Sequence, residues 1–280
     1  AISNKPKKAA QYGSNFDKAI EILAKKNNFF SKAQYLKNFF ENESVEVKNL
    51  TKNIPIGALI STGKDSLFAL YLMQKQGYDV KCLITIDSKN KDSYMFHTPT
   101  ISLAKLQSKA IGIPLIIAKT NGQKEIELAD LQKAIKIGVN KFGIEGVCSG
   151  ALYSNYQRER IEHICENLGI RSFSPLWHMN QLAYLKHLIS ARFGVIITKI
   201  AAKGLDEKWL GRIIDLNAID ELAVLETKLG INPAGEGGEY ESLVIDAPIF
   251  RKKIEVLLEK NMQNEFNGEI IVKSAKLVNK

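Results

Sequence analysis

The chain has only three cysteines in 280 residues, Cys82, Cys148 and Cys165, and no two of them form a Cys-x-x-Cys pair. An odd number of widely spaced cysteines excludes a disulfide framework and indicates no zinc site, so we expect reduced, structural thiols. Long apolar runs are also lacking: none approaches the roughly 18 uncharged residues of a membrane span, and the N-terminus has no apolar secretion signal. These absences predict a cytoplasmic protein that does not enter a membrane.

Clustered positive charge is absent as well, although the net charge is +9. The lysines are dispersed along the chain and are not interleaved with aromatic residues in one segment, so the sequence shows no local nucleic-acid footprint. We therefore do not expect nucleic acid to be the partner. The positive excess favours polyanions in general, such as ATP, tRNA or a ribosome-associated factor, without choosing among them.

Short apolar runs alternate with helical periodicity over the middle of the chain, which we take as one domain, residues 51–176. Strands bounded by glycine and proline with helices between them predict a parallel sheet covered on both faces, and such sheets bind ligands at the carboxyl ends of their strands. The predicted strands are 54–60, 80–86, 114–118 and 146–149, and the predicted helices are 64–76, 100–110, 126–142 and 153–168.

The two ends of the chain read differently from this middle part. Residues 177–280 predict a second, smaller α/β domain, with helices at 180–192 and 215–228 and strands at 195–200, 242–245 and 269–272. Residues 1–50 predict a helical N-terminal extension. Its phenylalanines are too many for a free tail, so we expect it to pack on a neighbour; a partner-binding arm is the alternative.

A six-residue turn, S-T-G-K-D-S from Ser61 to Ser66, follows the first predicted strand and opens a helix. Such a turn presents backbone N–H groups and the positive end of the helix dipole to an anion. It is not the common phosphate loop G-x-x-x-x-G-K-S/T, because five residues separate Gly57 from Gly63 and Asp65 replaces the hydroxyl residue. A site that grips the β and γ phosphates together predicts adenylation; a plain helix N-cap is the alternative.

A second string, N-P-A-G-E-G-G-E-Y-E-S at residues 232–242, carries three carboxylates among glycines. In an extended segment Glu239 and Glu241 project to one face and Tyr240 to the other. Two adjacent carboxylates repel, so a pair of this kind usually holds a cation, a proton or a substrate amine between them. An exposed acidic hairpin loop is the alternative.

Together these strings resemble a known family. The S-x-G-K-D-S turn resembles the PP-loop of the N-type ATP pyrophosphatases. Taken together, this turn and the acidic string resemble the diphthine–ammonia ligase family. Four further segments match that family in order, which makes six motifs across residues 54–250 and leaves 1–50 outside. These segments are Phe96–Pro99 (F-H-T-P), Ser154–Arg158 (S-N-Y-Q-R), Ser174–Trp177 (S-P-L-W) and Gly204–Arg212 (G-L-D-E-K-W-L-G-R).

The resemblance implies a fold, a reaction and a set of site residues. The fold is a parallel five-stranded doubly wound sheet of HUP/PP-loop type. The reaction uses ATP and Mg²⁺ to adenylate the diphthine carboxylate on translation elongation factor 2, releases pyrophosphate, and lets ammonia displace AMP; a homodimer is left open. The catalytic residues are Lys64, Asp65, Glu239 and Glu241, with Asp65 also a metal ligand. The nucleotide-binding residues are Ser61, Thr62, Gly63, Lys64, Ser66, Ile86 and His97. The substrate-binding residues are Tyr156, Gln157, Trp177, Gly235, Glu236, Gly237, Gly238, Glu239, Tyr240 and Glu241.

Chemistry gives these residues their expected roles. The turn holds the leaving pyrophosphate while Lys64 neutralises growing negative charge. The acidic string binds ammonium or the trimethylammonium of diphthine, with Tyr240 and Trp177 supplying aromatic faces. Glu239 is the expected base that takes the proton of ammonium, since burial raises a carboxyl pKa.

Three residues depart from the family pattern: Thr62 replaces a glycine, Asn155 an aspartate and Thr100 an asparagine. If position 62 needs a positive φ, its β-branched side chain costs about 1–3 kcal/mol. These departures keep open a catalytically reduced homologue or a nucleotide sensor that does not turn over. The net charge of +9 keeps open an RNA-modifying PP-loop enzyme, and the helical residues 16–50 leading into 54–61 keep open an asparagine-synthetase-like ligase. For Gly204–Arg212, a helix entry with Trp209 in the core is as well supported as a functional role.

Overall fold

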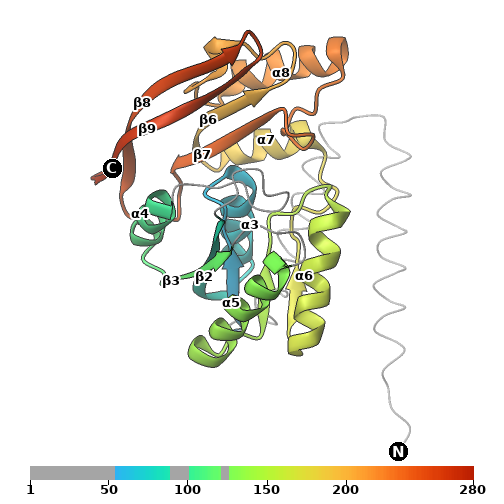
Figure 1. The fold of residues 1–280 in the computed structure, drawn as a ribbon, viewed down its shortest axis with the longest axis vertical. Helices are drawn as coiled ribbons and strands as arrows, with labels where there is room; N and C mark the ends of the chain where they lie inside the picture. The colour runs from blue at the N-terminus through green and yellow to red at the C-terminus, as the bar shows by residue number, and fades with distance from the viewer. Residues whose placement is uncertain (1–53, 89–100, 121–125) are drawn as a thin grey trace, which may run out of the picture. The chain divides into compact units, whose positions relative to one another are not determined.

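The computed structural model describes residues 54–88, 101–120 and 126–280, which belong to one compact unit spanning Lys52–Lys280 (Figure 1). The expected N-terminal extension, His97 and Thr100 lie outside the described residues. Among the described helices none is long and apolar enough to cross a membrane.

A parallel sheet forms the first half of this unit (Figure 1). Its strand order, β3-β2-β1-β4-β5, confirms the predicted five-stranded doubly wound sheet. The strands are β1 (Pro55–Leu59), β2 (Asp79–Ser88), β3 (Leu115–Thr120), β4 (Gly146–Cys148) and β5 (Arg171–Phe173). Four of them match the ranges predicted from the sequence, and β5 had no predicted range.

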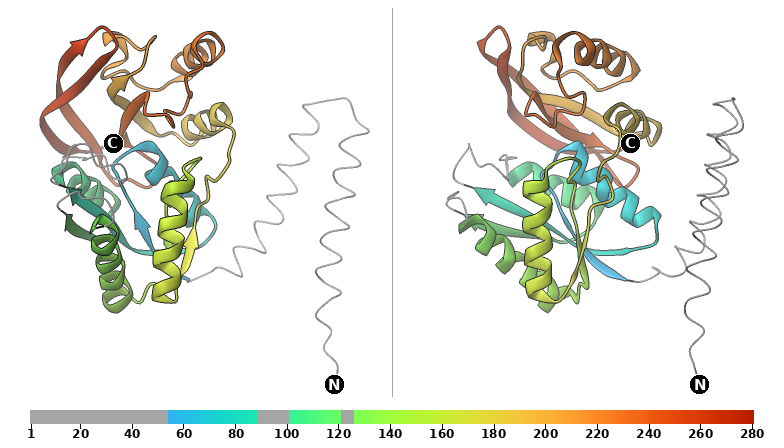
Figure 2. Two further views of the ribbon diagram at one scale, coloured as in Figure 1. Left: turned by 45° about the vertical axis from the view of Figure 1, so that its right-hand side comes forward. Right: turned by 90° about the vertical axis from the view of Figure 1, so that its right-hand side faces the viewer.

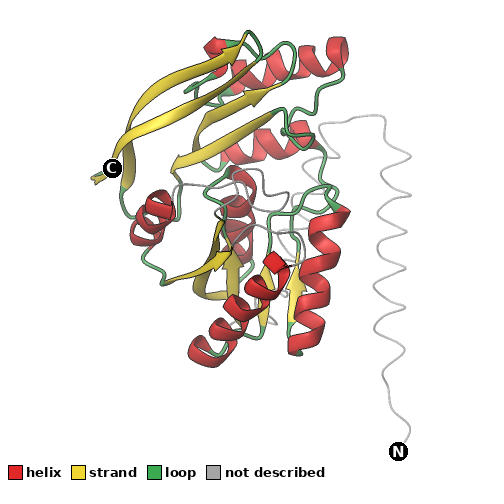
Figure 3. Ribbon diagram, viewed as in Figure 1, coloured by secondary structure: helices red, strands yellow, loops and turns green. Residues whose placement is uncertain are grey.

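Helices cover both faces of the parallel sheet (Figure 3). Alternation along β1 sends Ile56 and Ala58 into one core cluster and Leu59 into the other. The first cluster also takes apolar residues of α3 (Lys64–Lys75) and α4 (Ile101–Ile111). The second takes those of α5 (Ile126–Phe142) and α6 (Asn155–Leu168).

An antiparallel sheet with order β7-β6-β9-β8 forms the second half. Its strands are β6 (Gly194–Ala201), β7 (Tyr240–Asp246), β8 (Lys253–Asn264) and β9 (Asn267–Val278), and its helices are α7 (Gln181–Ser190), the short 3-10 helix η1 (Glu207–Trp209) and α8 (Leu216–Leu229). The predicted helices and the strands at 195–200 and 242–245 are present. The strand predicted at 269–272 is part of the longer β9, and β8 was not predicted.

The antiparallel sheet meets the parallel sheet at the carboxyl end of β1 (Figures 1 and 2). There the backbone N–H of Val244, on β7, donates to the carbonyl of Thr62 at 3.1 Å. The buried Gln107, on α4, donates through Nε2 to the same Thr62 carbonyl at 3.0 Å and to the Val244 carbonyl at 2.9 Å. One hydrophobic cluster continues from Ile56 to Ile254 across both sheets. A division into domains after residue 176 stays a prediction.

Candidate active site

The turn from Ser61 to Ser66 has the strand–turn–helix geometry that the sequence predicts. Gly63 is the N-cap of α3, and the Ser66 hydroxyl both accepts from the backbone N–H of Ser61 at 3.1 Å and donates to the Gly63 carbonyl at 3.2 Å. Gly150, just after β4, packs against this helix start: a Cβ there would lie 2.6 Å from the Ser66 nitrogen. The N-terminal end of α3 is therefore fixed at the carboxyl end of β1.

Thr62 lies in this turn with φ at 66°, in the left-handed region that favours glycine. Its side chain is buried, and its carbonyl takes the two hydrogen bonds from Gln107 and Val244 described above. Position 62 thus has the positive φ for which the sequence analysis expects a β-branched side chain to be strained. The contacts from α4 and β7 hold the threonine in a conformation that costs about 1–3 kcal/mol.

Lys64 joins the turn from Ser61 to Ser66, called the phosphate turn below for its expected role, to the acidic string at residues 232–242. Its ammonium, with the side chain only 4% exposed, donates to the Ala234 carbonyl at 2.6 Å and to Asp65 Oδ2 at 3.2 Å, and lies 5.1 Å from the centre of the Tyr240 ring. Burial alone lowers the pKa of Lys64, but the neighbouring negative charges, Asp65 first among them, outweigh it and hold the pKa above its usual range. Lys64 is therefore a buried cation.

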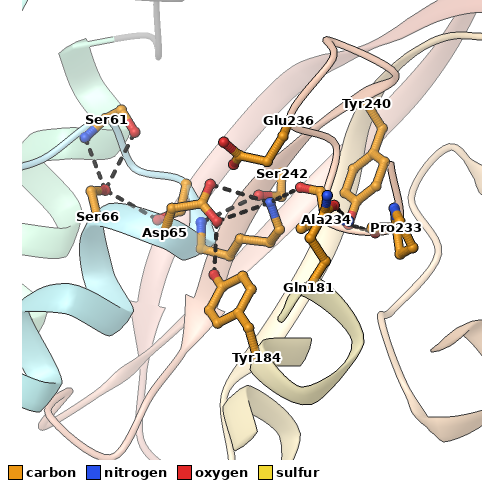
Figure 4. A network of polar contacts seen from close by, with 12 residues as sticks. Ser61, Asp65, Ser66, Gln181, Tyr184, Pro233, Ala234, Glu236, Tyr240 and Ser242 are labelled. Atoms are coloured by element: carbon orange, nitrogen blue, oxygen red, sulfur yellow. Dashed lines mark hydrogen bonds and ion pairs between the residues drawn. The ribbon is translucent and has the colours of Figure 1, made fainter. Parts of the chain in front are cut away.

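Helix α7 supplies two polar side chains to the same network (Figure 4). The Tyr184 hydroxyl donates to Asp65 Oδ1 at 2.8 Å. Gln181 accepts from the backbone N–H of Ala234 at 2.8 Å and donates to Asn232 Oδ1 at 3.1 Å. Neither Gln181 nor Tyr184 was predicted from the sequence as a site residue. A usable signal was present, because they are polar residues three apart on the helix face that buries Leu185 and Leu188.

The three carboxylates of the acidic string have different partners. Glu239, 8% exposed, accepts at Oε1 from the backbone N–H and the side-chain amide of Asn232, at 2.8 and 2.7 Å, and at Oε2 from the Gly237 N–H at 2.8 Å. Glu241, on β7, pairs with Lys199 at 3.3 Å. The loop is therefore not the exposed acidic hairpin considered as an alternative, and Glu239 organises its backbone.

Glu236 lies close to Asp65 in Figure 4, and the charges of Asp65 and Lys64 both act on its carboxylate. Its Oε2 accepts from the backbone N–H of Tyr153 at 3.2 Å, which ties the loop to the segment before α6. Burial, and after it the charge of Asp65, raises the pKa of Glu236 to about 7, against the opposing charge of Lys64. A carboxyl with this pKa can exchange a proton near neutral pH.

Arginine side chains cover the aromatic residues expected to bind substrate. The Arg158 guanidinium lies 4.5 Å from the centre of the Trp177 ring, and that of Arg160 lies 3.4 Å from the Tyr156 ring. Gln157 donates its backbone N–H to Ser154, the N-cap of α6. Asn155, the position that departs from an aspartate, is the first residue of that helix.

Two predicted nucleotide-binding residues remain, Ile86 and His97. Ile86 is buried in β2, and His97 lies outside the described residues.

The segment Gly204–Arg212 has its tryptophan in the core. Trp209 is 4% exposed and stacks with Arg212, which agrees with the core interpretation of this segment. That segment and α8 line a separate hollow of about 450 Å³.

A buried lysine in a strand–turn–helix at the carboxyl ends of a parallel sheet is typical of α/β proteins that bind phosphate groups. Comparison with known families is specific. Residues 55–172 match the diphthamide synthase N-terminal domain and residues 180–278 match the diphthamide synthase C-terminal domain. The chain belongs to the diphthamide synthase family.

Curated relatives agree with this family. The chain is 36% identical over 228 residues to the diphthine–ammonia ligase of Schizosaccharomyces pombe, covering 76% of this chain and 37% of that protein. It is 34% identical to those of Mus musculus and Homo sapiens, covering 72% and 71% of this chain and 82% and 81% of theirs. Among solved structures, the U34-tRNA thiolase NcsA from Methanococcus maripaludis matches with a TM-score of 0.35 at 13% identity, over 70% of this chain and 76% of that one. A likeness that low supports no functional inference.

Proposed function

We propose that this chain is an AMP-forming ligase that converts diphthine on translation elongation factor 2 to diphthamide, using ATP and ammonia. The observation that carries the proposal is the 2.6 Å hydrogen bond from Lys64, in the phosphate turn, to Ala234, in the acidic string. It brings together the two motifs that this chemistry needs, one for pyrophosphate release and one for an amine. Membership of the family and the relatives' names support it.

The first half-reaction forms an acyl adenylate. A carboxylate oxygen of diphthine attacks the α phosphorus of ATP, the bond from the α phosphorus to the bridging oxygen breaks, and pyrophosphate leaves. The backbone N–H groups at the start of α3 and the ammonium of Lys64 stabilise the negative charge that develops on the leaving group.

Magnesium fits this site as an ion that arrives with the nucleotide. Asp65 presents a carboxylate that is 29% exposed, and the described residues contain no cluster of three or more acidic, histidine or cysteine side chains that would hold a metal by themselves. Mg²⁺ commonly uses one or two carboxylates together with substrate phosphates. Bound in this way, it would neutralise phosphate charge. Asp65 is the residue we propose as its protein ligand.

The second half-reaction forms the amide. Ammonium gives up one proton to a base, the resulting ammonia attacks the acyl carbon, AMP leaves, and the nitrogen loses a further proton. Glu236 suits the role of base better than Glu239, because its carboxylate faces the phosphate turn whereas both oxygens of Glu239 accept bonds from the loop. We also propose that the protein acts in the cytoplasm.

The test is to incubate the chain with ATP, an ammonium salt and elongation factor 2 that carries diphthine. AMP, pyrophosphate and the amide should appear in equal amounts, and ammonium should be required for the amide. Release of ADP, or AMP formation that does not depend on the factor, would contradict the proposal. In single-turnover assays Glu236→Gln should slow amide formation by about 100-fold, the usual contribution of a base, while Glu241→Gln serves as the control within the same string.

A further inference from the structure

Two side chains of α7, Gln181 and Tyr184, reach the partners of Lys64 from one helix face. We propose that they are positioning residues, which set the Lys64 ammonium and the Asp65 carboxylate in place for the phosphate groups of ATP. The inference rests on the proposed use of the turn as a phosphate site. It extends that site to residues of the second half of the chain.

Tyr184 acts on Asp65. Its ring is fully buried and packs 5.6 Å from the Phe68 ring, so the hydroxyl has little freedom of position. It donates to Asp65 Oδ1 at 2.8 Å, while Asp65 Oδ2 takes the hydrogen bond from Lys64. Without this hydroxyl, the carboxylate is free to turn away from its present orientation.

Gln181 acts on the loop that holds Lys64 from the other side. Its side-chain oxygen accepts from the Ala234 N–H and its amide donates to Asn232, so both polar atoms of the side chain bind the loop. The carbonyl of the same Ala234 accepts from Lys64. A helix-borne side chain thereby fixes the acceptor that anchors the lysine.

The donor inventory of Lys64 explains why this arrangement suits a phosphate. An ammonium has three N–H groups. Among the described residues its hydrogen bonds go to Ala234 and Asp65 Oδ2, and Asp65 Oδ1 also lies 3.1 Å from the ammonium, so at most one N–H is left for a further acceptor. Two fixed partners orient the third donor before the ligand arrives, so a phosphate oxygen binds without the cost of ordering a long side chain.

Binding of inorganic pyrophosphate in the presence of Mg²⁺, measured by calorimetry, tests the proposal. Tyr184→Phe removes only the hydroxyl, and Gln181→Met keeps the size of the side chain. Tyr184→Phe loses one hydrogen bond to a charged group and Gln181→Met loses two bonds between neutral groups, so each should weaken pyrophosphate binding by about ten-fold. Tyr71→Phe is the matched control, because Tyr71 stacks on the same Phe68 and is not part of the site; it should bind as the unaltered chain does.

A double-mutant cycle separates positioning from general destabilisation. In a Lys64→Met background, Gln181→Met should change pyrophosphate affinity by less than two-fold, because its effect passes through Lys64. In an Asp65→Asn background, Tyr184→Phe should change the affinity by less than two-fold, because its effect passes through Asp65. Unchanged affinity in the single variants would overturn the proposal, and so would an equal loss with and without the residue on which each is proposed to act. Since the measurement needs neither diphthine nor ammonia, a failed amidation assay would contradict the proposed function and leave this result standing.

Discussion

Thr62 is a residue at which the turn from Ser61 to Ser66 is strained. Its φ of 66° places a β-branched side chain in a region that glycine occupies without strain. We expect Thr62→Gly to raise the free energy of unfolding by about 1 kcal/mol, the relieved strain less the greater entropy of glycine in the unfolded chain. Equilibrium urea denaturation measures it.

The control for this substitution is Thr62→Ala, which keeps the Cβ and therefore the strain. It should be less stable than Thr62→Gly by 1 kcal/mol or more, on the order of the cost of a left-handed non-glycine residue. Equal stabilities of the two variants would show that the turn tolerates a side chain at position 62 without strain.

Glu236 predicts a dependence of stability on pH. Its pKa is about 7 in the folded chain and about 4.5 when exposed. Between these two values the folded chain holds a proton that the unfolded chain has lost, so the free energy of unfolding falls as the pH rises. The loss should reach about 2–3 kcal/mol and level off above pH 7. Glu236→Gln removes it, so the stability of this variant relative to the unaltered chain should rise from pH 5 to pH 8 in denaturation experiments. A difference that is constant over this range would refute the raised pKa.

At the scale of an element, the loop from Asn232 to Glu239 depends on its own carboxylate. Glu239 accepts three hydrogen bonds, two at one oxygen and one at the other. An amide has one accepting and one donating end, so Glu239→Gln must lose at least one of these bonds and set a donor against a donor. We expect the free energy of unfolding to fall by about 1–3 kcal/mol. Glu241→Gln, which breaks a half-exposed ion pair, should cost at most about 0.5 kcal/mol. Equal losses would contradict the anchoring role of Glu239.

The sequence predicted elements well where periodicity was strong and missed those where it was not. Helix α5 has the predicted bounds, because a 17-residue amphipathic run leaves little choice. Strand β5 has three residues, too few for alternation to show. Strand β8 lies at the edge of its sheet and exposes most of its side chains, so its sequence lacks a continuous apolar face.

The site residues that could be predicted are those that stand in short sequence motifs. Lys64 and Asp65 belong to one motif and the acidic string is another, and within each motif the residues are close in the sequence. Gln181 and Tyr184 reach Lys64 and Asp65 from more than one hundred residues away, as the separation of 119 between Tyr184 and Asp65 shows. Which carboxylate faces the phosphate turn also depends on how the loop folds back on α7. The spacing on α7 puts Gln181 and Tyr184 on one helix face, but it gives neither their partners nor the carboxylate that faces the turn.

At the scale of the whole compact unit, the shared core predicts that both sheets unfold together. The cluster that contains Ile56 also contains Ile254, and Gln107 bonds to both sides of the junction. Differential scanning calorimetry should therefore show one transition for residues 52–280. Gln107→Met leaves two carbonyls with one donor fewer each, so it should lower the midpoint of that single transition by a few degrees. Two separable transitions would contradict a common core.

The reactivity of the three cysteines can be used to measure how often this unit opens. Cys82, Cys148 and Cys165 are all buried, and all belong to the parallel-sheet half, on β2, β4 and α6. Burial raises the pKa of Cys82 to about 11 and that of Cys165 to about 12, so the folded chain exposes almost no reactive thiolate. An alkylating reagent added to the native protein would thus count every opening, local or global, that exposes the parallel-sheet half. If ATP binds the folded chain, opening becomes rarer and the cysteines should be alkylated more slowly, so the rate of thiol modification would measure nucleotide binding.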